Sequence, residues 1–231
     1  MKEVLRQEKK YLYTYEQFKR MDCRFGKLLQ PDVHSGADGY TVRSLYFDTM
    51  QERDFYEKED GLEVRRKLRL RIYSPSDSFA MLEMKQKQGE NQKKRSLRVT
   101  REEAMKLASG RYDCLLKYED PFAGECYGIM NLHCYRPKSI VEYKRKAYIA
   151  KENSIRITFD HEIRATESDF SLFSETLNMY PVLDPYLVVM EVKYNGFLLS
   201  YIKDIISAEG KIPVSVSKYS LSRSVGLHYL L

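Results

Sequence analysis

Two neighbouring stretches of the chain place charged side chains at every second residue. Residues 67–72 (KLRLRI) alternate basic with apolar residues, and residues 82–87 (LEMKQK) repeat the alternation with Glu83, Lys85 and Lys87. Such a period of two is typical of β-strands, in which alternate side chains share one face. Arginine offers a planar fork that matches phosphate oxygens, and lysine offers a point charge. Two adjacent cationic faces therefore indicate a site for a phosphate-rich anion.

The same alternation recurs in at least four other stretches of the chain. The residues that would share a face are Arg6, Glu8 and Lys10; Lys93 and Arg95; Tyr143 and Arg145; Arg156, Thr158 and Asp160; and Glu191 and Lys193. Any one stretch could be the solvated face of an amphipathic strand. Glu191, however, interrupts the apolar run LVVMEVKY, where a carboxylate is costly to bury unless it is paired or binds a metal. Mg²⁺ or Mn²⁺ would fit such glutamates, because these ions bridge carboxylate and phosphate oxygens.

The elements that carry these residues read as strands joined mostly by hairpins. Strands are expected at 4–13, 40–48, 67–73, 79–87, 93–100, 138–149, 154–160 and 187–194. Helices are expected after the T-x-x-Q capping box of Thr14 and the T-x-x-E box of Thr100, at 49–61, at 197–208 and at 217–227. The stretch 111–136 is mixed and gives no clear element.

This pattern predicts an α+β protein. We expect one domain over residues 1–231, built as an eight-stranded antiparallel β-barrel with peripheral helices, because closure protects the strand edges. Facing inward, the charged faces would supply about ten Lys and Arg against three Glu. Such an interior repels itself unless a polyanion enters it.

Composition narrows the class of protein. The net charge of +6 is small for a nonspecific nucleic-acid binder, and no stretch reaches the length of a membrane span or a signal core. The four cysteines form no CxxC pair, so a structural zinc site is not expected. We expect a cytoplasmic protein with reduced thiols and no nucleic-acid partner. Oligomeric state and a membrane-protein partner stay open.

Eight motifs in chain order resemble one known family. They are EKKYL (8–12), VRSLYFDT (42–49), YEKEDG with the RxKLRLRIY run (56–73), LEMK (82–85), VEYKRKAY (141–148), IRITFD (155–160), MEVKY (190–194) and SKYS (217–220). Together they are similar to the VTC domain (vacuolar transporter chaperone) of the triphosphate tunnel metalloenzyme superfamily, which includes the CYTH proteins. The resemblance is to a free-standing, prokaryote-like form.

The resemblance implies an eight-stranded tunnel that binds triphosphate, and an enzyme that transfers the γ-phosphoryl of ATP to a growing polyphosphate chain. It implies these phosphate contacts: Lys10, Arg69, Arg71, Lys85, Lys93 or Arg95, Arg145, Arg156, Lys193, Ser217 and Lys218. Of these, Lys10, Arg69, Arg71, Arg145 and Arg156 would act in catalysis together with Glu191. Glu191 would hold Mn²⁺ or Mg²⁺, and Glu8 and Glu83 are further metal candidates.

One motif departs from the superfamily. Its N-terminal ExExK appears as Arg6-x-Glu8-x-Lys10, so a cation replaces the first carboxylate. This change speaks against a hydrolytic mechanism with two metals. Three hypotheses follow: a metal-dependent polyphosphate polymerase, a triphosphatase in which Glu8 or Glu83 orients water, and a polyphosphate-binding module without turnover.

Overall fold

The computed structural model describes residues 6–36, 38–89 and 91–227. Its strands are β1 (Arg6–Thr14), β2 (Gln30–Pro31), β3 (Tyr40–Asp48), β4 (Val64–Ile72), β5 (Phe79–Gln88), β6 (Asn91–Thr100), β7 (Arg136–Ala150), β8 (Ile155–Thr166), β9 (Tyr180–Pro181) and β10 (Leu187–Asn195). Its α-helices are α1 (Tyr15–Leu28), α2 (Arg53–Glu59), α3 (Arg101–Ala108), α4 (Pro121–Leu132), α5 (Ser200–Ser207) and α6 (Lys218–Leu227). Two short 3₁₀ helices span Asp113–Lys117 and Glu152–Ser154.

The strands form one antiparallel sheet in the order β1-β10-β8-β7-β3-β4-β5-β6, with β2 beside β7 and β9 beside β8. The predicted α+β class and antiparallel pairing are confirmed. The predicted closure into a barrel is wrong for the residues described, because no pairing joins β1 to β6. Strand periodicity shows which side chains share a face, but it carries no information on whether the two end strands pair.

The chain divides into two compact units. Unit 1 comprises residues 1–41, 143–163 and 183–217, and unit 2 comprises residues 42–142, 164–182 and 218–231. Strands β3, β7 and β8 each contribute residues to both units. The expectation of a single domain stays a prediction.

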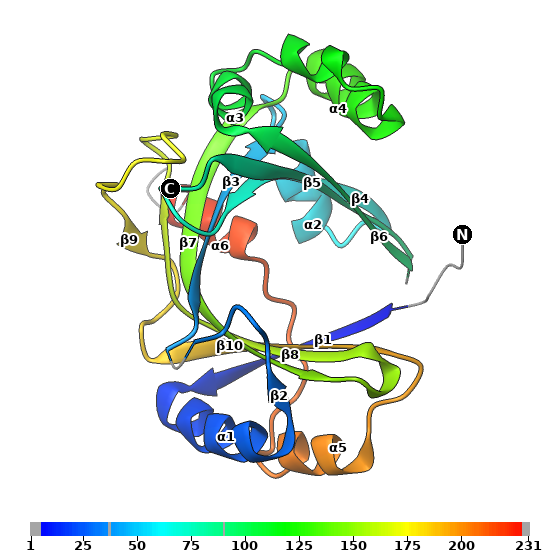
Figure 1. Cartoon of the computed structure of the whole chain (residues 1–231), viewed down its shortest axis with the longest axis vertical. Coiled ribbons are helices and arrows are strands. Elements are labelled where there is room, and N and C mark those ends of the chain that lie inside the picture. The colour runs from blue at the N-terminus through cyan, green and yellow to red at the C-terminus, as the bar shows by residue number, and fades with distance from the viewer. Residues whose placement is uncertain (1–5, 37, 90, 228–231) are drawn as a thin grey trace. The chain divides into compact units, whose positions relative to one another are not determined.

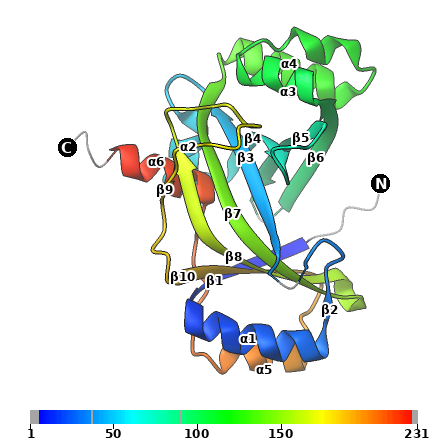
Figure 2. The same cartoon turned by 60° about the vertical axis from the view of Figure 1, so that its left-hand side comes forward.

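Unit 1 is a sheet region covered on one side by two helices. Figure 1 and Figure 2 both show α1 beside α5 against β1, β8 and β10. Phe18, Met21 and Phe25 of α1 recur at helical spacing and are buried with apolar residues of all three strands. Helix α1 begins at the predicted capping box, in which the Thr14 side chain accepts from the backbone of Gln17. Because α1 and α5 cover this side, the alternate residues of the strands lie on the other.

Unit 2 packs α3 and α4 against one side of β4, β5 and β6 (Figure 1). The buried strand residues on this side include Leu68, Leu70, Leu82 and Met84. The α3 capping box at Thr100 is also confirmed. The stretch that gave no clear element contains α4, which begins with Asp120 as N-cap and a proline at the first position.

Candidate phosphate- and metal-binding site

The side of unit 1 away from α1 carries a row of charged and neutral polar residues that we call the polar face. It consists of Glu8 and Lys10 of β1, Glu191 and Lys193 of β10, Arg156, Thr158 and Asp160 of β8, and Tyr143 and Arg145 of β7. Strand register sets this face, because Glu8 is opposite Lys193, Lys10 is opposite Glu191, and Glu191 is opposite Thr158. Side chains directly opposite in an antiparallel pair share a face.

Lys193 lies between two carboxylates of the polar face. Its Nζ is 2.5 Å from Oε1 of Glu191 and 3.9 Å from Oε2 of Glu8. Lys10 Nζ is 3.4 Å from Glu8 and donates to the carbonyl of Val216 at 2.8 Å. Both glutamate side chains are 9% exposed, so these ion pairs are only slightly screened by water.

Arg145 is held in a buried ion pair. Its Nε and Nη2 donate to the two carboxylate oxygens of Asp160 at 2.6 and 2.8 Å. Burial by itself would lower the pKa of Arg145, but the hydrogen-bonded Asp160, together with Tyr143 and Glu191, raises it. Two of the Arg145 nitrogens that could donate to phosphate thus donate to Asp160 instead. A phosphate contact by Arg145 stays a prediction.

Arg156 reaches a loop residue that the sequence did not single out. Its Nη2 donates to Asp32 at 2.7 Å and to the Tyr40 hydroxyl at 3.0 Å. Burial by itself would raise the pKa of Asp32, but hydrogen bonds from the His34 backbone and from Arg156 lower it. Asp32 is therefore an anionic partner of Arg156.

Unit 2 presents a second charged face on the side of β4, β5 and β6 away from α3. Register places Lys67 opposite Lys85, Arg69 opposite Glu83, and Lys85 opposite Lys94. We call this the cationic face: Arg65, Lys67, Arg69, Arg71, Glu83, Lys85, Lys87, Lys94 and Arg98. The expectation that the two opening stretches share a face is confirmed. Among the described residues of β4, β5 and β6, Glu83 is the single carboxylate against these eight cations.

Glu83 is enclosed by cations. Arg69 donates to it at 2.8 Å, Arg71 Nη1 lies 3.8 Å away, and the Lys94 ammonium makes a close ion pair with it. Burial by itself would raise the pKa of Glu83, but these three charges lower it to about 2. Glu83 therefore acts as an internal counter-ion for the cationic face.

Arg69 contacts one of two stacked tyrosines. Tyr46 of β3 accepts a hydrogen bond from Arg69 at 3.1 Å and stacks on Tyr219 of α6 at a centroid distance of 5.2 Å. The Tyr219 hydroxyl donates to buried Asp48 at 2.7 Å. These contacts hold the start of α6, where Lys218 follows Ser217 of unit 1, against β3.

The structure brings Lys94 to the cationic face, where the sequence suggested Lys93 or Arg95. Arg95 lies on the opposite side, where it makes an ion pair with Glu125 of α4 and lies 5.0 Å from the Phe122 ring centre. Lys93 is opposite Gln86 and shares that side. The cause is the register of the hairpin: β5 and β6 are separated by two residues, where the sequence suggested a five-residue turn. Placing Lys93 or Arg95 with Arg69 is therefore wrong.

The two faces differ in charge. On the polar face, four cations are balanced by four carboxylates once Asp32 is included. Sequence reasoning missed Asp32 because it lies in a loop. The expected excess of cations over carboxylates is found on the cationic face of unit 2.

The carboxylates differ in how well they suit a divalent cation. Glu8 and Glu191 both approach the Lys193 ammonium, so their oxygens converge on a position that already holds a cation. Oxygen donors of this kind fit Mg²⁺ or Mn²⁺. Glu83 does not fit as a metal ligand, because three protein cations surround it. In the part of the chain that the structure describes, no three His, Cys, Asp or Glu side chains gather as a ready metal cluster.

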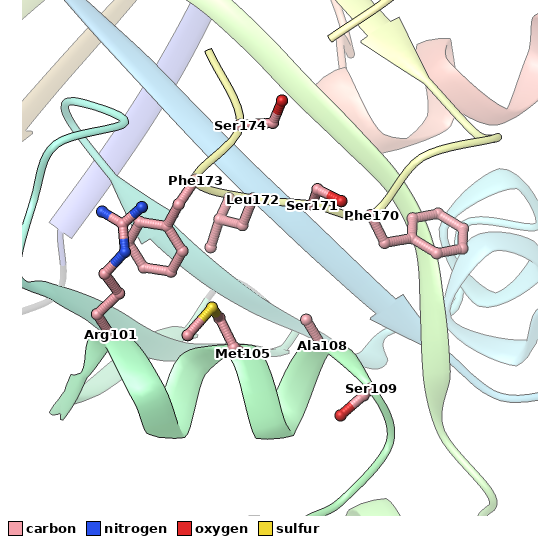
Figure 3. Close-up of a pocket in the computed structure, with 9 residues that line it drawn as sticks. All are labelled: Arg101, Met105, Ala108, Ser109, Phe170, Ser171, Leu172, Phe173 and Ser174. Carbon is pink, nitrogen blue, oxygen red and sulfur yellow. The ribbon is translucent and has the colours of Figure 1, made fainter. Parts of the chain in front are cut away.

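A separate cavity of about 540 Å³ lies on the helix-covered side of unit 2 (Figure 3). Met105 and Ala108 of α3 face Phe170 and Leu172 across it. Its charged lining residue, Arg101, donates to the carbonyls of residues 75 and 77 and lies over the Phe173 ring. The lining is mostly apolar and is unsuited to phosphate.

Among the described residues, no helix combines the length and apolar character that crossing a bilayer requires.

Comparison with known proteins assigns the family. The family model of the VTC domain matches residues 5–225. A protein of Bacillus halodurans described as a putative adenylate cyclase has a similar structure, with a TM-score of 0.54, 11% identity and 93% coverage of both chains. A protein of Vibrio parahaemolyticus with the same description gives a TM-score of 0.52 at 12% identity, covering 95% of this chain and 98% of the other. No curated protein gives a match. The fold is therefore CYTH-like, and the chain belongs to the VTC domain family.

Proposed function

We propose that this protein is a metal-dependent phosphotransferase that binds ATP, triphosphate or polyphosphate and extends a polyphosphate chain. The observation that carries the proposal is the cationic face, on which eight cations share one side of three strands with a single carboxylate. Such an excess on adjacent strands repels itself, and a linear polyanion would relieve the repulsion. Membership of the VTC family supports the same ligand class.

Phosphoryl transfer needs positioning and charge neutralisation more than covalent chemistry. Arg69, Arg71, Lys85 and Lys94 would bind the phosphate chain on the cationic face, since each arginine fork matches phosphate oxygens. Within unit 1, Lys10 and Arg156 of the polar face are the cations that would neutralise phosphate oxygens. Ser217 and Lys218 would contribute at the start of α6.

Glu191 and Glu8 would hold Mn²⁺ or Mg²⁺, which supplies neutralisation of phosphate oxygens when bound. Lys193 is the cation at those carboxylates in the structure and would turn to phosphate when they bind metal. Arg145 would act mainly by fixing Asp160 and the strands around it.

The second candidate is a polyphosphate-binding module without turnover. It is favoured by the ion pairs of Glu8, Glu83 and Glu191, each of which is held by protein cations. The same ion pairs disfavour a triphosphatase, because a carboxylate locked to lysine or arginine orients water poorly.

Phosphorus-31 NMR of the protein with ATP and Mn²⁺ tests the proposal. Growth of an internal-phosphate signal together with ADP, lost in Glu191→Gln and kept in Glu125→Gln, is the expected result. Glu125→Gln is the matched control, because it also breaks a carboxylate ion pair but lies on the helix-covered side. ADP with free phosphate alone would identify a hydrolase, and binding of polyphosphate without turnover would identify the module.

A further inference from the structure

The polar face contains a buried hydroxyl whose role is not explained by protein contacts. Thr158 is 2% exposed, and among the described residues its Oγ1 has no hydrogen-bond partner. A buried hydroxyl without a partner loses its hydration and gains nothing in return. In native proteins such groups usually meet an ordered water or an ion.

The neighbours of Thr158 are committed elsewhere. Both carboxylate oxygens of Asp160 accept from Arg145, and Arg156 donates to Asp32 and Tyr40. The residue directly opposite Thr158 on β10 is Glu191. The hydroxyl thus lies on the same face as the carboxylate that is best placed to hold a divalent cation.

We propose that the Thr158 hydroxyl is the third protein oxygen, beside Glu191 and Glu8, for a divalent cation on the polar face. The inference rests on the proposed function and gives a role to Thr158, to which the family resemblance assigned none. A neutral threonine hydroxyl is a suitable oxygen donor for Mg²⁺ and Mn²⁺, and nucleotide-binding P-loops use Ser or Thr in this way.

Lys193 completes the argument, because its ammonium lies where the two glutamates converge. It is 2.5 Å from Glu191 and 3.9 Å from Glu8. A lysine ammonium satisfies carboxylates but has no acceptor, so it could meet the Thr158 hydroxyl only as a donor. A divalent cation that displaced Lys193 could be coordinated by oxygens of Glu191, Glu8 and Thr158. Lys193 therefore competes with the metal for the two carboxylates.

The two residues predict opposite effects on metal affinity. Thr158→Val keeps the shape and removes the oxygen, so it weakens Mn²⁺ binding about tenfold, the scale on which supporting groups tune metal sites. Lys193→Met removes the competing cation and strengthens Mn²⁺ binding by a similar factor. Thr158→Val also raises the melting temperature of the metal-free protein by about 2–4 °C, because it deletes an unsatisfied buried hydroxyl.

Thr166→Val is the matched control. Thr166 is equally buried, but its hydroxyl lies 3.2 Å from that of Ser168 and is satisfied. Its replacement lowers the melting temperature and leaves Mn²⁺ affinity unchanged.

The experiment measures free Mn²⁺ by electron paramagnetic resonance during titration of each full-length variant, with melting curves recorded without metal. Weaker binding with higher thermal stability in Thr158→Val, and tighter binding in Lys193→Met, are the expected results. A Thr158→Val protein that binds Mn²⁺ like wild type, or that loses stability as Thr166→Val does, overturns the assignment of Thr158. If wild type and Glu191→Gln bind Mn²⁺ equally, the polar face does not hold the metal at all. The Glu191→Gln titration therefore distinguishes a failure of the metal site from a failure of the Thr158 assignment alone.

Discussion

The substitution Glu83→Gln, which removes the internal counter-ion, should destabilise the protein. It should also increase the rise in melting temperature that triphosphate causes. The Glu83 pKa is lowered to about 2 from its ordinary 4.5. At about 1.4 kcal/mol per pKa unit, the ion pairs with Arg69, Arg71 and Lys94 stabilise the fold by about 3 kcal/mol at neutral pH. This contribution is present above the ordinary pKa of Glu and is lost as the pH falls from 4.5 towards 2.

At pH 7 the variant should therefore melt about 6–12 °C below wild type. Triphosphate oxygens can then take the place of the missing carboxylate, because three cations are left without it. Tenfold tighter triphosphate binding would add about 1.4 kcal/mol of ligand stabilisation over wild type at the same ligand concentration.

Differential scanning fluorimetry at low salt, with and without triphosphate, measures both effects. Glu125→Gln is the control: it breaks the ion pair with Arg95 on the other side of the sheet, and its triphosphate shift should equal that of wild type. A Glu83→Gln protein whose triphosphate shift is no larger than that of wild type would refute the view that Glu83 stands in for a bound anion.

Three other experiments test the geometry and the buried charges. Lys94→Ala should weaken triphosphate binding about tenfold by isothermal titration calorimetry, whereas Lys93→Ala, on the opposite side, should change it less than about twofold; equal effects would contradict the observed register. Arg145→Met should cost about 3–5 kcal/mol in urea unfolding because it leaves buried Asp160 unpaired, and adding Asp160→Leu should restore most of that loss. Asp54 has a pKa raised to about 7 by burial and by Asp48, so it makes unfolding free energy fall as the pH rises from about 4 to 7; Asp54→Asn should flatten that slope in urea titrations, and an unchanged slope would exclude the buried Asp54 as its source.

Much of the fold follows from local sequence. The capping boxes at Thr14 and Thr100 mark two helix starts correctly, because both side chains of each box satisfy free backbone groups. Period-two alternation also places Lys67, Arg69 and Arg71 on one face, since the pleat leaves no other arrangement. The start of α4 was readable as well, from Asp120 followed by proline, although the mixed stretch around it concealed this signal.

Other features depend on contacts that no local pattern encodes. A shift of one residue at the β5–β6 hairpin exchanges Lys94 for Arg95 on the cationic face, and turn residues alone did not fix that register. The pairing of Asp32 with Arg156 and the unpaired ends of the sheet likewise depend on long-range packing. The metal and phosphate roles of the site residues stay predictions until they are measured.

The open sheet has a consequence for how the protein behaves at high concentration. Strand β6 ends the described hydrogen-bonded path, and an unpaired edge can recruit a second chain. Lys93, Lys94 and Arg95 lie consecutively on this strand, so two such edges repel each other. A long polyanion would screen that repulsion and could bridge two molecules. Excess polyphosphate should therefore drive self-association, which light scattering would detect and added salt would reverse.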